Sequence, residues 1–318
     1  MFDNNILLNM EEVGLGNLTE YRLLVILANY HSLSLVEGKT GTPNDIVDSS
    51  GRLLYPAYYM THLKVPFTEF IESFSLWDRY DINIDVKKFG ANILDSEYSF
   101  KRNTGGKSGG ESITMSSNSF FVVDSTLDKS IERTASIPDS KCISKLENLK
   151  RVPDSLKKFK DIRENGFILK NVAGKYTLLY QIRIDIDVSY NHGVVFAKFT
   201  QIMDICLNEY LFSSNELGLP KSLYPYIHTV ERETYYYANC FADDIVKCNM
   251  EFSFKDCEEK SFTGSNKEVT PFWFVATFEL YNKNTNCLLV ISKVKKIICL
   301  PVGQLDLRYD LNRILHNK

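Results

Sequence analysis

A polar turn that leads into an amphipathic helix is the part of this sequence best suited to chemistry. Asn191, His192 and Gly193 separate an alternating segment, 176–188, from a segment with helical spacing, 196–212. The first N–H groups of a helix have no partner within the helix and carry a partial positive charge. Such groups stabilise the oxyanion that forms when a carbonyl carbon is attacked. We therefore consider Asn191 a catalytic candidate and His192 and Gly193 substrate-binding candidates; the alternative is a polar turn without a chemical role.

Other polar side chains could support chemistry at this turn. Arg232 and Asn239, on and just after the next expected strand, are candidates for binding a substrate. His31 lies near the end of the first expected helix and is a catalytic candidate, because imidazole titrates near neutral pH. The alternative is a histidine that only satisfies the helix end. Asp204 could act as a general base only if burial raised its pKa.

An expected strand in the first half is rich in tyrosine. Tyr55, Tyr58 and Tyr59 lie so close together that they must divide between the two faces of that strand. A tyrosine in such a position usually packs with its hydroxyl hydrogen-bonded. Packing is therefore the first interpretation, and catalysis by Tyr55 is the alternative.

Patterns for metal or phosphate binding are absent from the sequence. There is no H-E-x-x-H motif, no cluster of histidine and cysteine, and no aspartate-rich loop. The glycine-rich segment 105–110 has Lys101 where a phosphate-binding loop needs its first glycine, and a strand is expected where a helix is required. We expect a hairpin loop there and no bound cofactor.

Composition limits the class of protein. The 318 residues suffice for two domains, and 44% are hydrophobic, which indicates a globular chain with a sizeable core. A net charge of −3 without a basic stripe argues against a nucleic-acid partner. The first ten residues lack a cationic leader, and no apolar run is long enough for a membrane span. Seven cysteines without a C-x-x-C pair favour free thiols in a reducing compartment, so we expect a soluble cytoplasmic protein.

The elements around the candidate residues occur in the same order twice. In the first half, a short strand near 6–10 precedes a helix that Thr19 can cap and whose apolar residues recur at helical spacing through Leu33. We expect strands to follow it at 54–65, 79–89, 93–102 and 111–123. In the second half we expect a strand at 176–188, a helix at 196–212 and strands at 227–237, 244–254, 272–280 and 287–298.

This repeated order predicts an internal structural duplication. A long helix followed by four antiparallel strands is best buried when the sheet wraps around it. The predicted fold is α+β, a double hot dog, with two copies of a central helix wrapped by an antiparallel sheet. We expect an N-terminal hot dog at 1–125, a charged linker with one or two short helices at 126–174, and a C-terminal hot dog at 175–318.

The sequence resembles the double hot-dog family of the leinamycin-type bifunctional acyltransferase/decarboxylase of polyketide biosynthesis. The resemblance covers nearly the whole chain and rests on short motifs: Gly14 and Leu15; Asp48, Gly51, Arg52 and Tyr55; Phe89, Gly90, Leu94, Asp95 and Ser96; Asn191, Gly193, Phe196 and Ala197; Arg232, Tyr236 and Asn239. His192, Lys198 and the long charged linker depart from the family pattern.

This resemblance implies an enzyme of polyketide or other secondary metabolism. It would decarboxylate malonyl-CoA or methylmalonyl-CoA and move an acyl group such as propionyl to an acyl carrier protein, so that CoA and phosphopantetheine thioesters are substrates. The resemblance also implies that Tyr55 lies in the active site. A phenol with a pKa of about 10 is a poor nucleophile at neutral pH. A hydrogen bond from Tyr55 to the thioester enolate demands less of the protein, with His31, Asn191 and the Gly193 backbone as supporting donors.

Two other functions remain open. The protein could be a hot-dog thioesterase or dehydratase that acts on an acyl-CoA or acyl-carrier-protein thioester, because one fold hosts many activities. It could instead be a non-catalytic module that binds a loaded acyl carrier protein. Neither nucleic acid nor a membrane is an expected partner, and a homodimer remains an open alternative.

Overall fold

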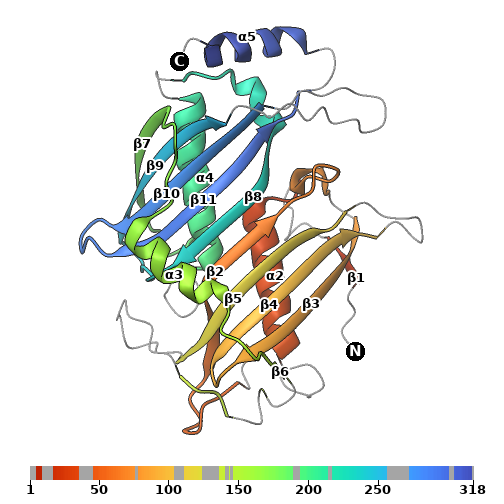
Figure 1. Ribbon diagram of the computed structural model, residues 1–318, viewed down its shortest axis with the longest axis vertical. Coiled ribbons are helices and arrows are strands. Elements are labelled where there is room, and N and C mark those ends of the chain that lie inside the picture. Colours follow the sequence, from red (N-terminus) through yellow and green to blue (C-terminus); the bar gives the residue numbers. More distant parts are fainter. Residues whose placement is uncertain are drawn as a thin grey trace.

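The strands of the protein form one long, twisted sheet (Figure 1). The computed structural model describes residues 5–8, 17–35, 46–75, 78–103, 111–123, 136–139, 143, 146–188, 194–213, 217–255, 272–300 and 304–316. The strands follow one another across the sheet in the order β1 (Asn5–Leu7), β3 (Arg79–Phe89), β4 (Ile93–Arg102), β5 (Ile113–Val123), β2 (Leu54–Lys64), β8 (Ile227–Tyr236), β11 (Leu288–Ile298), β10 (Phe272–Asn282), β9 (Ile245–Lys255) and β7 (Gly174–Gln181). These neighbours pair antiparallel, and the short β6 (Glu147–Asn148) pairs parallel with β3.

Two long helices cover one face of this sheet (Figure 1). The helix α2 (Glu20–Leu35) lies over the half formed by β1 to β5, and α4 (Phe196–Phe212) lies over the half formed by β7 to β11. We call the face that carries α2 and α4 the inner face. The helix α3 (Asp154–Asn165) crosses the outer face, where Leu156, Phe159 and Ile162 pack against Tyr59 and Tyr235. The helix α5 (Leu305–His316) lies beyond the end of α4 (Figure 1).

The two halves join through their edge strands. β2 pairs antiparallel with β8, with Met60 opposite Tyr235 and Leu63 opposite Arg232. The register between β2 and β5 shifts between Tyr58 and Met60, which marks a β-bulge close to this junction. The sheet is therefore continuous across the middle of the molecule.

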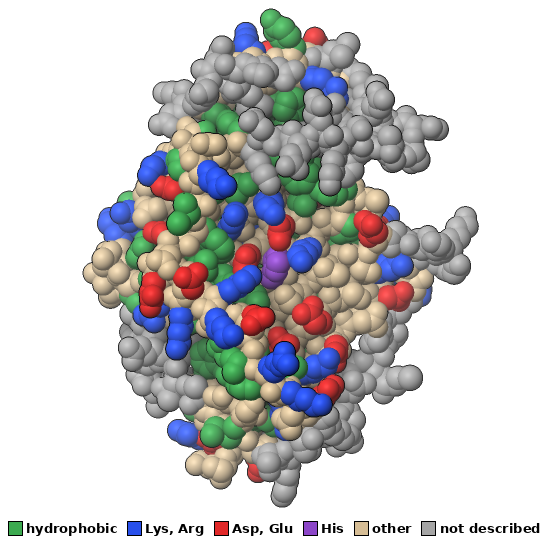
Figure 2. Space-filling view, in the orientation of Figure 1, with side chains coloured by type: hydrophobic (Ala, Val, Ile, Leu, Met, Phe, Trp, Pro, Cys, Tyr) green, Lys and Arg blue, Asp and Glu red, His purple; other side chains and the backbone are tan. Residues whose placement is uncertain are grey.

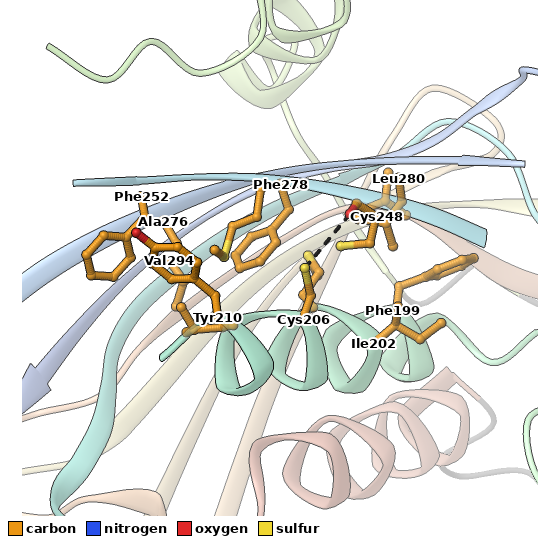
Figure 3. Close-up of a cluster of buried hydrophobic side chains, with 14 of the residues drawn as sticks. Phe199, Ile202, Cys206, Tyr210, Cys248, Phe252, Ala276, Phe278, Leu280 and Val294 are labelled. Atoms are coloured by element: carbon orange, nitrogen blue, oxygen red, sulfur yellow. Dashed lines mark hydrogen bonds between the residues drawn. The ribbon is translucent and has the colours of Figure 1, made fainter. Parts of the chain in front are cut away.

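Apolar side chains from α4 and the inner face form the larger core. Figure 3 shows Phe199, Ile202 and Cys206 of α4 facing Cys248 and Phe278 of the sheet, and all five are fully buried. The helix has apolar residues on most of its surface, because it is enclosed by the sheet on one side and by α2 on the other.

The outer face is mixed in charge. Acidic and basic side chains lie side by side over much of the surface in Figure 2. Glu231 lies between His62 and Lys295, 2.8 Å from the His62 Nε2 atom and 2.5 Å from the Lys295 Nζ atom. The hydrogen bond from His62, together with the one from Lys295, lowers the pKa of Glu231 to about 2. Neighbouring side chains of opposite charge are typical of a solvated sheet face.

Local periodicity predicted most elements correctly. The helix 196–212 and the strands 79–89 and 93–102 have the expected bounds. The strand expected at 176–188 is wrong at its end, because β7 stops at Gln181 and residues 184–187 form a turn. The helix α5 was not predicted from the sequence. The glycine-rich segment 105–110 lies outside the described residues. In the described part of the chain, no helix is both long and apolar enough to cross a membrane.

Gly174 permits close contact between β7 and α4. A Cβ atom at this position would lie 1.8 Å from the hydroxyl oxygen and 2.6 Å from the Cζ atom of Tyr210. We expect Gly174→Ala to lower the free energy of unfolding by about 1–3 kcal/mol, because the buried ring has to move. Urea denaturation would measure the change.

The control variant removes the Tyr210 hydroxyl, the atom that lies nearest to the added Cβ. In a Tyr210→Phe background the same substitution meets no hydroxyl, so the loss should be smaller than in the wild type. An equal loss in both backgrounds would show that the contact is not the cause.

Candidate active site

A buried ion pair lies at the start of α4. The Lys198 Nζ atom lies 2.6 Å from the Asp187 Oδ1 atom, and the two side chains are 5% and 0% exposed. Lys198 belongs to the first turn of α4, where the helix dipole disfavours a cation. Asp187 supplies the compensating negative charge. The pair thereby links the two residues that flank segment 188–197, in which the sequence places Asn191, His192 and Gly193.

Further hydrogen bonds hold this pair. The Tyr180 hydroxyl donates to Asp187 Oδ1 at 3.3 Å, and the Arg183 backbone N–H donates to Asp187 Oδ2 at 2.9 Å. Lys198 also donates to Gln201 Oε1 at 2.6 Å. Burial, reinforced by Asp187, raises the pKa of Tyr180 to about 12, so its hydroxyl keeps its proton at neutral pH. We call Tyr180, Asp187, Lys198 and Gln201 the junction cluster.

The beginning of α4 has no side-chain cap. Val195 occupies the N-cap position, and its side chain cannot accept a hydrogen bond. The preceding residue, Val194, donates its N–H to the Cys240 carbonyl at 3.1 Å, and the Asn239 side chain accepts the Cys240 N–H at 2.9 Å. Asn239 therefore lies beside the start of α4. The Lys198 N–H donates to the Val195 carbonyl at 2.8 Å, so the N–H groups of Phe196 and Ala197 are the candidates to bind an anionic oxygen.

A second polar group lies under the first half of the sheet. His31 is fully buried, and its Nδ1 atom is hydrogen-bonded to the Tyr98 hydroxyl. The Tyr98 hydroxyl lies 2.9 Å from the Ser117 Oγ atom. Burial lowers the pKa of His31 to about 4 and raises that of Tyr98 to about 12, so both side chains are neutral at neutral pH. The His31 Nε2 atom has no hydrogen-bond partner among the described residues.

Aromatic contacts connect this second group with the start of α4. The Tyr58 ring lies 4.4 Å from the Phe196 ring and 5.7 Å from the His31 ring, measured between centroids. The Tyr236 ring lies 5.8 Å from Phe196, and its hydroxyl lies 3.2 Å from the Thr61 Oγ1 atom. The structure therefore brings His31 close to the beginning of α4.

Tyr55 lies on the other face of the sheet. On β2, Tyr55 pairs with Val122, whereas Tyr58 pairs with Ser119. Successive side chains of a strand alternate between faces, so Tyr55 and Tyr58 point in opposite directions. Because Tyr58 contacts His31 on the inner face, Tyr55 is directed to the outer face. The structure does not bring Tyr55 together with His31.

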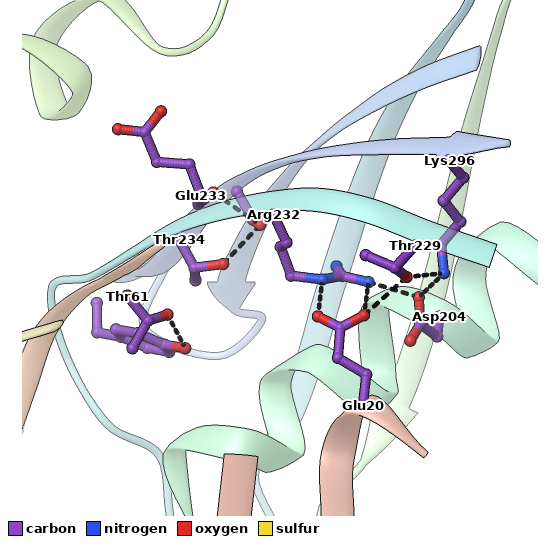
Figure 4. Close-up of polar contacts among 10 residues, drawn as sticks. Glu20, Thr61, Asp204, Thr229, Arg232, Glu233, Thr234 and Lys296 are labelled. Carbon is purple, nitrogen blue, oxygen red and sulfur yellow. Dashed lines mark hydrogen bonds and ion pairs between the residues drawn. The ribbon is translucent and has the colours of Figure 1, made fainter. Parts of the chain in front are cut away.

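Arg232 belongs to a buried network of charges between the two helices (Figure 4). Its Nε atom lies 2.5 Å from Glu20 Oε1 of α2, and its Nη2 atom lies 2.7 Å from Asp204 Oδ1 of α4. Lys296 Nζ lies 3.2 Å from the same Asp204 oxygen and donates to Thr229 Oγ1 at 2.8 Å. Thr229 in turn donates to Glu20 at 2.9 Å. The structure thus gives Arg232 protein partners on two helices.

The condition for base catalysis by Asp204 is not met. Burial acts to raise the pKa of Asp204, but the charges and hydrogen bonds of Arg232 and Lys296 outweigh it and hold the pKa below its usual value. A carboxylate held this way is a poor general base at neutral pH.

Known proteins share the architecture but not the sequence. No protein-family model and no curated protein matches this chain. A protein from Lactobacillus plantarum assigned as an oleoyl thioesterase is 11% identical, with 94% of this chain and 96% of the other covered and a TM-score of 0.61. The 12:0-ACP thioesterase from Umbellularia californica is 13% identical, with 92% of each chain covered and a TM-score of 0.51.

The chain has a double hot-dog fold. One hot dog wraps β1 to β5 around α2, and the other wraps β7 to β11 around α4. The predicted fold class is confirmed. The narrower resemblance to the leinamycin-type acyltransferase/decarboxylase stays a prediction.

The site candidates divide into three groups in this double hot dog. Asn191, His192 and Gly193 lie outside the described residues. Asn239 and His31 lie near the start of α4. Asn239 accepts the N–H of Cys240, whose carbonyl bonds to Val194, and His31 contacts Tyr58, which contacts Phe196. Tyr55 and Arg232 form the third group, on the outer face and in the buried charge network. The roles of all these candidates remain predictions. Among the described residues, no group of three or more histidine, cysteine, aspartate or glutamate side chains could hold a metal ion.

The buried pair Asp187–Lys198 at the start of α4 was not predicted from the sequence. In the sequence, Asp187 continues the alternating pattern of the preceding strand, and Lys198 stands out only as a departure from the family pattern. A lysine in the first turn of an otherwise apolar helix is the signal that could have found it. Such a cation needs an anionic partner when it is buried, and Asp187 is an acid just before the turn.

Acid should destabilise the fold through His31. Its pKa is about 4 in the folded chain because of burial, against an ordinary value of 6.5. Between these values the unfolded chain binds a proton that the folded chain does not, so this contribution to stability is complete above pH 6.5 and is lost as the pH falls toward 4. We expect a loss of about 3 kcal/mol over this interval.

Urea denaturation at several pH values would measure this effect. His31→Phe keeps an aromatic ring and removes the titrating group, so its stability should fall less steeply with acid than that of the wild type. Identical pH dependence of the two proteins would contradict the assignment to His31.

Proposed function

We propose that this protein hydrolyses acyl thioesters of CoA or of an acyl carrier protein. The observation that carries the proposal is the uncapped start of α4 beside the buried Asp187–Lys198 pair. The solved structures of similar fold support it, since both that we compare are assigned as thioesterases.

The reaction follows from the chemistry of this helix start. The thioester carbonyl oxygen would accept hydrogen bonds from the first N–H groups of α4, which would stabilise the tetrahedral oxyanion. A water molecule adds to the carbonyl carbon and gives up a proton. The carbon–sulfur bond then breaks, and the thiol leaves as the carboxylic acid forms.

The junction cluster would position the segment that carries the polar turn. Asp187 and Lys198 hold its two ends through one buried contact. Asn191 is our candidate to orient the water, and His192 is our candidate to accept its proton and pass it to the leaving thiolate. Buried Cys240 is not a candidate nucleophile, because burial raises the pKa of its thiol.

Transfer with decarboxylation would use the same thioester but another acceptor. The family resemblance implies this activity and assigns it to Tyr55. The register of β2 directs Tyr55 away from the start of α4, so no observation favours transfer over hydrolysis.

The test is product analysis by mass spectrometry. The purified protein is incubated with acyl-CoA and acyl-carrier-protein thioesters of several chain lengths, and with malonyl-CoA and methylmalonyl-CoA. We expect free acid and free thiol from the wild type and equally from Tyr55→Phe. Loss of CO2 that depends on Tyr55 would support the transferase and decarboxylase instead. A stable complex with loaded carrier protein and no turnover would indicate a binding module.

A further inference from the structure

The inner face of the first hot dog carries buried polar atoms that lack partners. The His31 Nε2 atom and the Ser119 Oγ atom have no hydrogen-bond partner among the described residues, and both residues are 0% exposed. An atom left unpaired in the interior loses the hydrogen bonds that it makes with water in the unfolded chain. Native proteins usually satisfy buried polar groups with protein, water or ligand.

These atoms belong to a compact set of polar side chains. Tyr98 links His31 to Ser117, and the register places Ser119 opposite Tyr58 on the same face. We call His31, Tyr58, Tyr98, Ser117 and Ser119 the inner polar cluster. The cluster lies beside the start of α4, because the Tyr58 ring contacts both His31 and Phe196.

Apart from the buried charge network around Arg232, the rest of the inner face is mainly apolar. Toward the beginning of α2, Leu23 and Leu24 pack with Tyr80 and Phe100. In the second hot dog the face opposite α4 carries side chains such as Phe252, shown in Figure 3. Glu20 of the first hot dog is held in that network, and the inner polar cluster lies at the end nearest the candidate active site.

We propose that the inner polar cluster binds an oxygen atom on the acyl group of the substrate. The preferred substrates are then acyl thioesters with a hydroxyl or keto group on the chain, in place of plain fatty-acyl thioesters. This inference rests on the proposed thioester hydrolysis.

The donors and acceptors of the cluster suit such an oxygen. A neutral imidazole has one donor and one acceptor nitrogen, so Nε2 can donate to a keto oxygen or accept from a hydroxyl group, depending on the tautomer. His31 is neutral at neutral pH because burial lowers its pKa to about 4. The Ser119 hydroxyl can also donate or accept. An unsubstituted chain would leave both groups unpaired, and such a site discriminates strongly against the analogue without the oxygen.

The test compares matched substrates. We would measure kcat/KM for octanoyl-CoA and for octanoyl-CoA with a hydroxyl or keto group at carbon 3, 5 or 7. In the wild type we expect at least one oxygenated substrate to exceed octanoyl-CoA by about tenfold or more, mainly through KM. The ratio should fall toward one in Ser119→Ala and His31→Leu.

The control removes an equivalent hydroxyl outside the cluster. Thr200 Oγ1 on α4 is also buried and without a partner among the described residues. Thr200→Ala should keep the preference. A ratio near one in the wild type would mean that a trapped water alone satisfies the cluster, and would overturn the proposal while hydrolysis stands. A preference that survives both Ser119→Ala and His31→Leu would also overturn it.

Binding separates this proposal from the proposed function. If no thioester is hydrolysed, the proposed function fails, and equilibrium dialysis with the same substrates decides the inference by itself. Tighter binding of an oxygenated thioester that depends on His31 and Ser119 would still support the cluster as its site. Equal binding of all the thioesters would overturn the inference as well.

Discussion

Arg232→Met is expected to lower the free energy of unfolding by about 3–5 kcal/mol, as is typical when one partner of a buried ion pair is removed. The Arg232 side chain is 2% exposed and that of Glu20 is 4% exposed, so neither has access to water that could replace the lost partner. Methionine fills a similar volume, but among the described residues it leaves Glu20 with Thr229 as its one side-chain donor and Asp204 with Lys296 as its one cationic partner. Urea denaturation would measure the loss.

Two further variants show whether burial is the reason. Arg313 pairs with Asp310 on α5, where both side chains are well exposed, so Arg313→Met should cost less than about 1 kcal/mol. Adding Glu20→Gln to Arg232→Met removes the stranded carboxylate and should restore part of the lost stability. If Arg232→Met is as mild as Arg313→Met, the network does not hold the two hot dogs together.

Asp187→Asn is expected to reduce thioester hydrolysis by about 100-fold, because the segment that carries the polar turn would lose its anchor. The same change leaves Lys198 buried without an anionic partner, so the free energy of unfolding should also fall by about 3–5 kcal/mol. Activity and stability would therefore change together in this single variant. kcat/KM and urea denaturation measure the two effects.

The double variant Asp187→Asn with Lys198→Met separates the effect on hydrolysis from the effect on stability. It removes both charges, so most of the stability should return. Hydrolysis should remain low, because the direct contact between the two ends of segment 188–197 is still missing. Recovery of full activity with stability would mean that the pair is only structural. Unchanged activity in Asp187→Asn would remove it from the site altogether.

The local apolar pattern predicted the fold better than it predicted the candidate site. The bounds of β3, β4 and α4 agree with the apolar spacing, because that spacing depends only on which faces of an element are buried. The turn at 184–187 escaped the same reasoning, because its residues continue the alternation of β7. Asp187 accepts the N–H of Arg183 there, a local bond that the alternating pattern does not reveal.

The candidate site residues show more clearly what the sequence does not predict, namely which side chains meet. Tyr55 and Tyr58 look equivalent in the sequence, and the pairing of β2 with β5 assigns them to opposite faces. His31 was a candidate on residue type, but Tyr98, far away along the chain, accounts for its hydrogen bond. Neither partner is implied by spacing, because strand register brings them together.

The sequence by itself determined the order of the elements, the duplication and the hot-dog class, because apolar periodicity is a local property that follows from burial of one side. Only the tertiary structure decided which polar side chains are buried and with which partners. The pairs Asp187–Lys198 and Glu20–Arg232 exist because helix packing and strand register place opposite charges in contact away from water. The free energy of a buried charge depends on that partner, and the partner is a property of the folded chain.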